Sequence, residues 1–177
     1  KAGIDLSSAA RSLIAADRRH FFKPNDFTVE AADEWIAQRM PELVGVRAAI
    51  VGAGNIGAKL AWRLAERGCE VCLAGRRMTV LEETARGLST ILRGSGRIAA
   101  VADVSAACAG AELIIGCTPG VPVIDASAVE VSRAALLLDV GNGCFARDAI
   151  AAAQQRGVPL EVLAPAAGWE GFLRRYA

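Results

Sequence analysis

Two arginines, Arg76 and Arg77, follow an apolar run about twenty residues after a glycine-rich turn. In a dinucleotide-binding α/β unit this place lies beside the adenosine ribose, where Asp or Glu binds the 2′-hydroxyl of NAD. Residues 74–77 read Ala-Gly-Arg-Arg and hold no carboxylate. A guanidinium presents a planar fork of donors that matches phosphate oxygens, and Gly75 leaves room for that group. The pair therefore indicates a 2′-phosphate, and hence NADP, although two solvated loop arginines are the simpler alternative.

The glycine-rich turn over 52–57 reads Gly-Ala-Gly-Asn-Ile-Gly and matches the G-x-G-x-x-G pattern. It leaves an apolar strand pattern and opens an amphipathic helix pattern, which is the context that the motif requires. The first glycine permits the tight turn, the second leaves room for a pyrophosphate, and the third lets the helix approach the strand. The helix start offers its free N–H groups to the anion. The predicted contacts in this turn are Gly52, Gly54, Asn55, Ile56 and Gly57.

From Val46 onward, apolar runs alternate with amphipathic stretches in the order strand, helix, strand, helix. The runs are almost continuously hydrophobic, which is typical of a parallel sheet covered on both faces. The pattern predicts an α/β fold with a doubly wound, mostly parallel six-stranded sheet in the order 3-2-1-4-5-6. The predicted strands span 46–51, 70–74, 97–101, 112–116, 135–140 and 158–163. The predicted helices between them span 55–67, 79–93, 103–109, 125–132 and 147–156.

The stretch before Val46 predicts two helices instead of strands. One covers about 7–22, and the other ends near Met40, where a stripe of apolar residues at helical spacing stops. Pro24 separates them because the residue before a proline avoids helical backbone angles. The expected division is a short N-terminal helical segment over 1–44 and an NADP-binding domain over 45–177.

The remaining cofactor contacts are expected where the other strands end, because ligands of such sheets bind at the carboxyl ends near the switch point. Residues 116–120 and 139–143 should therefore border the nicotinamide half of the cofactor. Asp103, two residues after the third strand, could border the adenine, although capping of the next helix explains it as well. The ordinary preference of glycine and proline for turns explains the glycines and the proline of these two segments equally well. These further candidates are Asp103, Cys117, Thr118, Pro119, Gly141 and Gly143, with Thr79 as a helix cap and donor beside the arginines.

Three segments, "VGAGNIG…LAERGCEVCLAGRR", "AELIIGCTPGVPVI" and "ALLLDVGNG", resemble one known NADP-binding domain. Shikimate dehydrogenases, glutamyl-tRNA reductases and bacterial methylene-tetrahydromethanopterin dehydrogenases share that domain, and the resemblance covers about residues 44–163. It implies a Rossmann fold and an NADP-linked reductase or dehydrogenase acting on a carbonyl or imine-type carbon. Those families carry a substrate domain with catalytic Lys, Asp or Cys ahead of the nucleotide fold. Here the possibilities are an upstream substrate domain, a site completed by a partner subunit such as a homodimer mate, or minimal catalysis.

The sequence does not identify a catalytic group. Lys23, Asp26 and Cys117 are weak candidates for a proton donor, and His20 is more readily a solvated helix end. Asp26 is also a plausible helix cap and Cys117 a small buried hydrophobe. The expected function is an NADP-dependent oxidoreductase that transfers a hydride between NADP(H) and a small carbonyl or imine-type substrate, amino-acid-derived or cyclic. The alternatives are a non-catalytic NADP-binding subunit or sensor, and a dehydrogenase of a folate- or pterin-bound one-carbon unit.

The composition favours a small molecule as the binding partner over a nucleic acid or a membrane. Basic and acidic residues are interleaved to a net charge of +1 and only 5% of residues are aromatic, which argues against nucleic acid. Five cysteines without metal spacing and a single histidine predict reduced thiols in a cytoplasmic protein and no metal site. No apolar stretch reaches the ~18 residues of a membrane span, so no membrane partner is expected.

Overall fold

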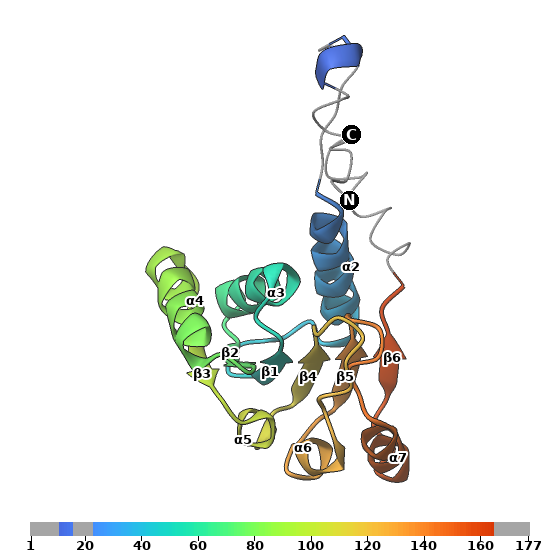
Figure 1. Ribbon diagram of the computed structural model, residues 1–177. Coiled ribbons are helices and arrows are strands. Elements are labelled where there is room, and N and C mark those ends of the chain that lie inside the picture. The colour runs from blue at the N-terminus through green and yellow to red at the C-terminus, as the bar shows by residue number, and fades with distance from the viewer. Residues whose placement is uncertain (1–10, 16–22, 165–177) are drawn as a thin grey trace.

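The computed structural model describes residues 11–15 and 23–164, and its central feature is one parallel sheet (Figure 1). The strand order is β3-β2-β1-β4-β5-β6, which confirms the predicted doubly wound arrangement. The strands are β1 (Arg47–Val51), β2 (Glu70–Ala74), β3 (Arg97–Val101), β4 (Leu113–Gly116), β5 (Leu136–Asp139) and β6 (Leu160–Val162). The helices are α2 (Pro24–Arg39), α3 (Asn55–Glu66), α4 (Met78–Ile91), α5 (Val104–Cys108), α6 (Ala126–Glu130) and α7 (Arg147–Gln155).

The chain reverses its winding beside β1, and this creates the switch point of the sheet. It runs outward from β1 through β2 to β3, then returns through α5 to β4 on the other side of β1. The connections after β1 and β4 therefore leave the sheet on opposite faces. In open α/β sheets, ligands bind in the crevice that such a divergence leaves at the carboxyl ends of the strands.

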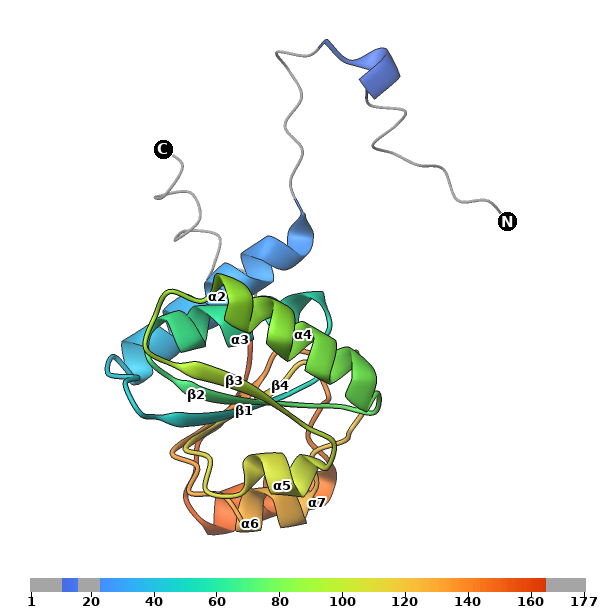
Figure 2. The ribbon, with the colours of Figure 1, turned by 90° about the vertical axis from the view of Figure 1, so that its left-hand side faces the viewer.

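Helices cover both faces of the sheet, as Figure 2 shows, with α2, α3 and α4 on one side and α5, α6 and α7 on the other. Successive strand residues alternate between the two cores. Ile50 and Leu73 belong to the cluster beneath α2, α3 and α4, whereas Ala49 and Val51 belong to the opposite cluster. All four residues are buried, which explains why the strand segments read as continuous apolar runs.

Helix α2 is packed into the first of these cores. Val29, Ala32 and Ile36 are at most 1% exposed and belong to the same buried cluster as strand residues of β4 and β5. At the far edge of the sheet, the Trp35 indole N–H and the Arg39 guanidinium donate to the carboxylate of Glu161 in β6. Residues of the predicted N-terminal segment thus contribute to the core of the nucleotide fold.

Two element boundaries differ from expectation because of proline. Helix α2 begins at Pro24, the residue that was expected to separate two helices, and Lys23 before it has extended backbone angles. Proline suits the first helical position because its missing N–H would have no partner there. Strand β6 begins at Leu160 and not at residue 158, since Val158 still bonds to Ala153 of α7 and Pro159 has no N–H for the ladder.

Only 11–15 of the helix expected over 7–22 are described, and His20 lies outside the described residues. No helix among the residues described here has the length and hydrophobicity needed to cross a bilayer.

Candidate functional site

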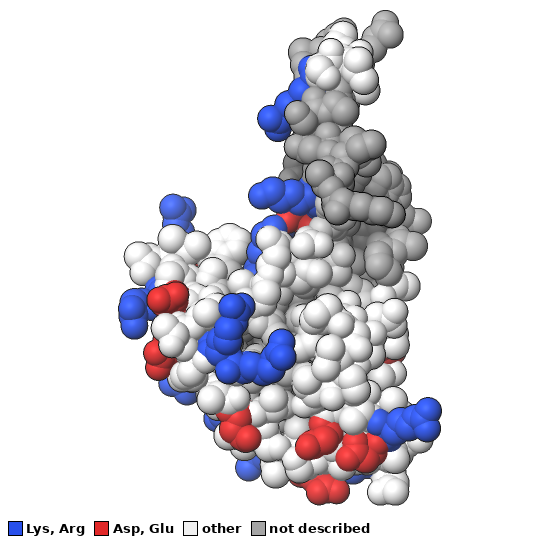
Figure 3. Space-filling model, viewed as in Figure 1, with Lys and Arg blue, Asp and Glu red and all other residues white. Residues whose placement is uncertain are grey.

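A cleft of about 340 Å³ opens at the carboxyl ends of the strands around the switch point. Its wall consists of 51–54 after β1, 75–77 with Val80 and Leu81 after β2, and 117–119 with Val123 after β4, together with Ala102 and Val104 after β3. On the face drawn in Figure 3, Lys and Arg side chains gather around a hollow near the middle of the molecule. The cleft is therefore mostly apolar, with positive charge at the end that β2 forms.

The glycine turn over 52–57 has the backbone geometry that the motif predicts. Gly52 has a φ of 107°, in the left-handed region that disfavours side chains, and its N–H donates to the Ala74 carbonyl at 2.8 Å. A Cβ on Gly57 would lie 1.9 Å from the Gly52 oxygen, so only glycine lets α3 start this close to β1. A Cβ on Gly54 would meet nothing within 4 Å, because that residue faces open space. The turn is thus shaped to leave its outer side free.

Helix α3 begins at this turn without a side-chain cap. Its N-cap residue is Gly54, which has no side chain to bond the first N–H groups, and the first turn contains no acidic residue. The first N–H groups of a helix have no partner within the helix and carry the positive end of its dipole. The start of α3 can therefore bind an anion that lies beside Gly54.

Arg76 and Arg77 line the same cleft just after β2, the strand next to β1, and are exposed. Among the described residues neither has an ion-pair or hydrogen-bond partner on its side chain. Arg77 is the N-cap of α4, which has no side-chain cap either. The prediction that Thr79 caps this helix is wrong, because α4 begins one residue earlier, at Met78. Two free guanidinium groups and an uncapped helix start therefore meet at this end of the cleft.

The loop after β4 forms the third wall. Cys117, Thr118 and Pro119 line the cleft, and the Thr118 hydroxyl donates to the Val121 carbonyl at 2.9 Å within its own turn. Gly141 lies behind this loop, where a Cβ would come within 1.8 Å of the Thr118 oxygen. The close approach expected at Gly141 is thus made to the protein's own backbone.

The structure brings only part of the predicted set to the cleft wall. The predicted residues on the wall are Gly52, Gly54, Gly75, Arg76, Arg77, Cys117, Thr118 and Pro119. Those behind or beside it are Asn55, Ile56, Gly57, Thr79, Asp103, Gly141 and Gly143. Asp103 accepts the Ala106 N–H at 2.7 Å and caps α5, which is the helix-capping alternative.

Sequence reasoning missed most of the apolar part of the wall, namely Val80, Leu81, Val104 and Val123. These residues follow strands β2, β3 and β4 within a few positions, and that position is the signal that could have found them. Their apolar side chains suit a flat ring system better than a charged group.

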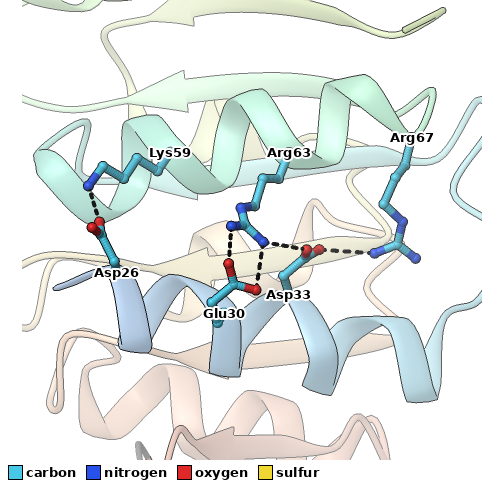
Figure 4. A network of polar contacts seen from close by, with 6 residues as sticks. All are labelled: Asp26, Glu30, Asp33, Lys59, Arg63 and Arg67. Atoms are coloured by element: carbon cyan, nitrogen blue, oxygen red, sulfur yellow. Dashed lines mark hydrogen bonds and ion pairs between the residues drawn. The ribbon is translucent and has the colours of Figure 1, made fainter. Parts of the chain in front are cut away.

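The three catalytic candidates differ in their surroundings. Cys117 reaches the cleft wall, but burial raises the pKa of its thiol well above the usual value, so it stays protonated at neutral pH. Asp26 forms an ion pair with Lys59 of α3, the first contact of the network drawn in Figure 4. Lys23 is exposed at the start of α2. Neither Asp26 nor Lys23 lines the cleft.

Within the part of the chain that the structure describes, no three His, Cys, Asp or Glu side chains are grouped to hold a metal ion. The five cysteines are free thiols, and four of them are buried.

The fold is similar to that of several solved enzymes. A dipicolinate synthase subunit from Bacillus halodurans is 14% identical with a TM-score of 0.61, covering 95% of this chain and 60% of that one. Quinate dehydrogenase from Corynebacterium glutamicum in complex with NAD is 16% identical with a TM-score of 0.55, covering 80% and 52%. A D-lactate dehydrogenase from Sporolactobacillus sp. is 18% identical with a TM-score of 0.59, covering 81% and 48%. The chain spans 60% or less of the length of these proteins, and at such identity the likeness shows the fold alone.

A family model identifies the sequence more closely. No curated protein sequence matches the chain. Residues 47–143, more than half of the 177 residues, match the model described as "NADP oxidoreductase coenzyme F420-dependent". The match runs from the start of β1 past the end of β5, so it includes the glycine turn, the paired arginines and the loop after β4. The chain therefore belongs to this family of NADP oxidoreductases.

Proposed function

We propose that this chain binds NADP(H) in the cleft and presents the nicotinamide for hydride transfer to or from a small carbonyl or imine-type substrate. The observation that carries the proposal is the pair of arginines after β2, which have no side-chain partner among the described residues and lie in a segment without a carboxylate. An acidic side chain there would accept the ribose 2′-hydroxyl of NAD and repel a 2′-phosphate. Quinate dehydrogenase was solved with NAD, so the fold by itself does not exclude NAD, and the choice of NADP rests on Arg76 and Arg77.

The proposed binding mode assigns one group of the cofactor to each wall. The uncapped start of α3 beside Gly54 holds the pyrophosphate, and the arginines with the uncapped start of α4 hold the 2′-phosphate. The apolar residues Val80, Leu81 and Val104 pack against the adenine, and the loop from Cys117 to Pro119 borders the nicotinamide ribose. The residues present therefore fit a phosphorylated dinucleotide, which supplies the hydride.

The proton that accompanies a hydride needs a donor. On the cleft wall, among the described residues, the ionisable side chains are the two arginines and the protonated Cys117 thiol. An arginine does not release its proton near neutral pH, and Cys117 is too weak an acid at that pH because burial raises its pKa. The proposal accordingly assigns the proton donor to a group that is not on the described cleft wall, such as one in an upstream substrate domain or a partner subunit.

This same lack of a donor on the described wall supports a second candidate function, a non-catalytic NADP(H)-binding subunit. The two candidates differ in turnover. A dehydrogenase oxidises NADPH when a substrate is supplied, and the family description makes coenzyme F420 one hydride partner to include. A binding subunit shows the same affinity for NADPH without turnover.

Titration with NADPH and NADH, followed by the fluorescence of the reduced nicotinamide, tests the proposal. We expect NADPH to bind at least about tenfold more tightly, the scale of one charge-assisted hydrogen bond. Arg76→Ala and Arg77→Ala should each weaken NADPH binding by about 1–2 kcal/mol and leave NADH unchanged, since both side chains are exposed and partly screened.

Arg86→Ala is the matched control, because Arg86 is an exposed arginine of α4 that does not line the cleft. Equal affinity for the two dinucleotides, or a double Arg76→Ala/Arg77→Ala variant that still prefers NADPH, would contradict the assignment of the 2′-phosphate.

A further inference from the structure

The loop that follows β5, residues 140–144, has an unusual backbone, and we call it the rim loop. Asn142 has a φ of 61° and Gly143 a φ of 109°, so two consecutive residues lie in the left-handed region. Asn142 is the single non-glycine residue with a positive φ among the described residues. Such a conformation costs free energy and persists where surrounding groups hold it in place.

Asp139, the last residue of β5, holds the rim loop. Its side chain is buried, with 4% of the residue exposed. The N–H groups of Gly143 and Cys144 donate to its Oδ2 at 2.7 and 3.0 Å. Hydrogen bonds to a carboxylate are stronger than those between neutral groups, so this single side chain fixes the return of the loop.

The rim loop in turn supports the loop after β4, residues 117–123, which we call the wall loop. The Gly120 N–H donates to the Gly141 carbonyl at 3.0 Å, and the Cys144 thiol donates to the Thr118 carbonyl at 3.1 Å. The Val123 N–H donates to the Cys144 carbonyl at 2.9 Å. The backbones are in direct contact, because a Cβ on Gly141 would overlap the Thr118 oxygen.

These contacts form one path from a buried carboxylate to the cleft. Asp139 does not line the cleft, but Cys117, Thr118, Pro119 and Val123 of the wall loop do. We infer that Asp139 is a positioning residue for the nicotinamide half of the cofactor, acting through the rim loop on the wall loop. This inference rests on the proposed binding of NADP(H). It concerns Asp139, which belongs neither to the G-x-G-x-x-G turn nor to the pair of arginines.

A second feature of Asp139 agrees with this role. Its other oxygen, Oδ1, is buried and has no hydrogen-bond partner among the described residues. An unsatisfied buried acceptor is costly, so its presence calls for a physical explanation. Asparagine would fill the same volume and accept the same two N–H bonds without burying a charge, so it is the natural comparison.

The test separates the two halves of the cofactor. Binding of NADPH and of adenosine 2′,5′-bisphosphate, which lacks the nicotinamide half, is measured on the full chain for wild type, Asp139→Asn and Asp139→Ala. We expect Asp139→Ala to weaken NADPH binding by about tenfold, the scale of one hydrogen bond to a charged group, while the bisphosphate affinity stays within about twofold. Asp139→Asn should lie between wild type and Asp139→Ala.

Ser132→Ala is the control for a purely structural effect. Ser132 is also buried, and its hydroxyl bonds to two backbone groups, the Val129 carbonyl and the Ala134 N–H, in the turn before β5. It should lower the free energy of unfolding without changing the ratio of the two affinities.

An unchanged affinity ratio in Asp139→Ala overturns the inference, and if that variant does not fold, an unchanged ratio in Asp139→Asn does so. A wild-type chain that binds neither NADPH nor the bisphosphate overturns the proposed function instead. A wild-type chain that binds both, with variants that lose both equally, leaves the proposed function standing and refutes the role of Asp139.

Discussion

The contact between α2 and α3 rests on a polar network that a single substitution can test. Arg63 of α3 donates to Glu30 at 3.0 Å and to Asp33 at 3.1 Å, and Arg67 donates to Asp33 at 3.1 Å (Figure 4). The hydrogen bond to Glu30 is the main reason why the pKa of Arg63 is raised above its usual value. Arg63→Ala removes the cation that Glu30 and Asp33 share and leaves Arg67 paired with Asp33.

The magnitude follows from how far these side chains are exposed. The fractions are 24% for Arg63, 13% for Glu30 and 19% for Asp33, between an exposed pair and a buried one. Exposed pairs contribute about 0–1 kcal/mol, whereas breaking a buried pair costs about 3–5 kcal/mol. We therefore expect Arg63→Ala to lower the free energy of unfolding by about 2 kcal/mol.

Urea unfolding of the full chain, followed by circular dichroism, measures this loss. Arg97→Ala is the control, because Arg97 is 73% exposed and pairs with Glu70, which is 36% exposed. It should change the free energy of unfolding by less than about 0.5 kcal/mol. A double-mutant cycle of Arg63→Ala with Glu30→Gln should show a coupling of about 1 kcal/mol.

If Arg63→Ala were no more destabilising than Arg97→Ala, the reasoning would be refuted. The apolar contacts of Val29, Ala32 and Ile36 would then hold α2 on the sheet without help from the network.

Two further predictions concern glycines and thiols. Gly57→Ala should destabilise the protein by more than about 2 kcal/mol and abolish NADPH binding, because its Cβ would overlap the Gly52 oxygen. Gly87→Ala in α4 should instead stabilise the protein by about 0.5–1 kcal/mol, since a Cβ there meets nothing within 4 Å. Thermal unfolding and NADPH titration of both variants would show whether the distance from the added Cβ to neighbouring atoms decides if the substitution stabilises or destabilises the protein. Burial raises the pKa of Cys69 and of Cys108 to about 12, from a usual value of 9.0, so both thiols ionise first in the unfolded chain. The contribution of these two thiols to the free energy of unfolding should thus be fully present below pH 9 and fall by up to about 1.4 kcal/mol per pH unit per thiol as the pH rises toward 12. A Cys108→Ala variant that kept the full alkaline slope in urea unfolding would contradict this.

Local patterns in the chain were sufficient to predict the sheet and one end of the cleft. Continuous apolar runs at the six strand positions predicted a parallel sheet, because only strands covered on both faces lack polar positions. The place of the glycines of residues 52–57 and of the arginines after β2 could also be predicted, since each has a fixed position in a supersecondary unit of known geometry.

Contacts between distant segments could not be read in this way. Asp139 accepts hydrogen bonds from Gly143 and Cys144, and Cys144 in turn bonds to a loop about twenty residues earlier in the chain, a contact that no local pattern predicts. The close packing of Gly141 against the Thr118 backbone is one such contact. The position of α2 over β4 and β5 likewise depends on which face of the sheet the later helices leave uncovered. Composition and periodicity report how a segment is buried, whereas the identity of its neighbours across the sheet exists only once the chain has folded.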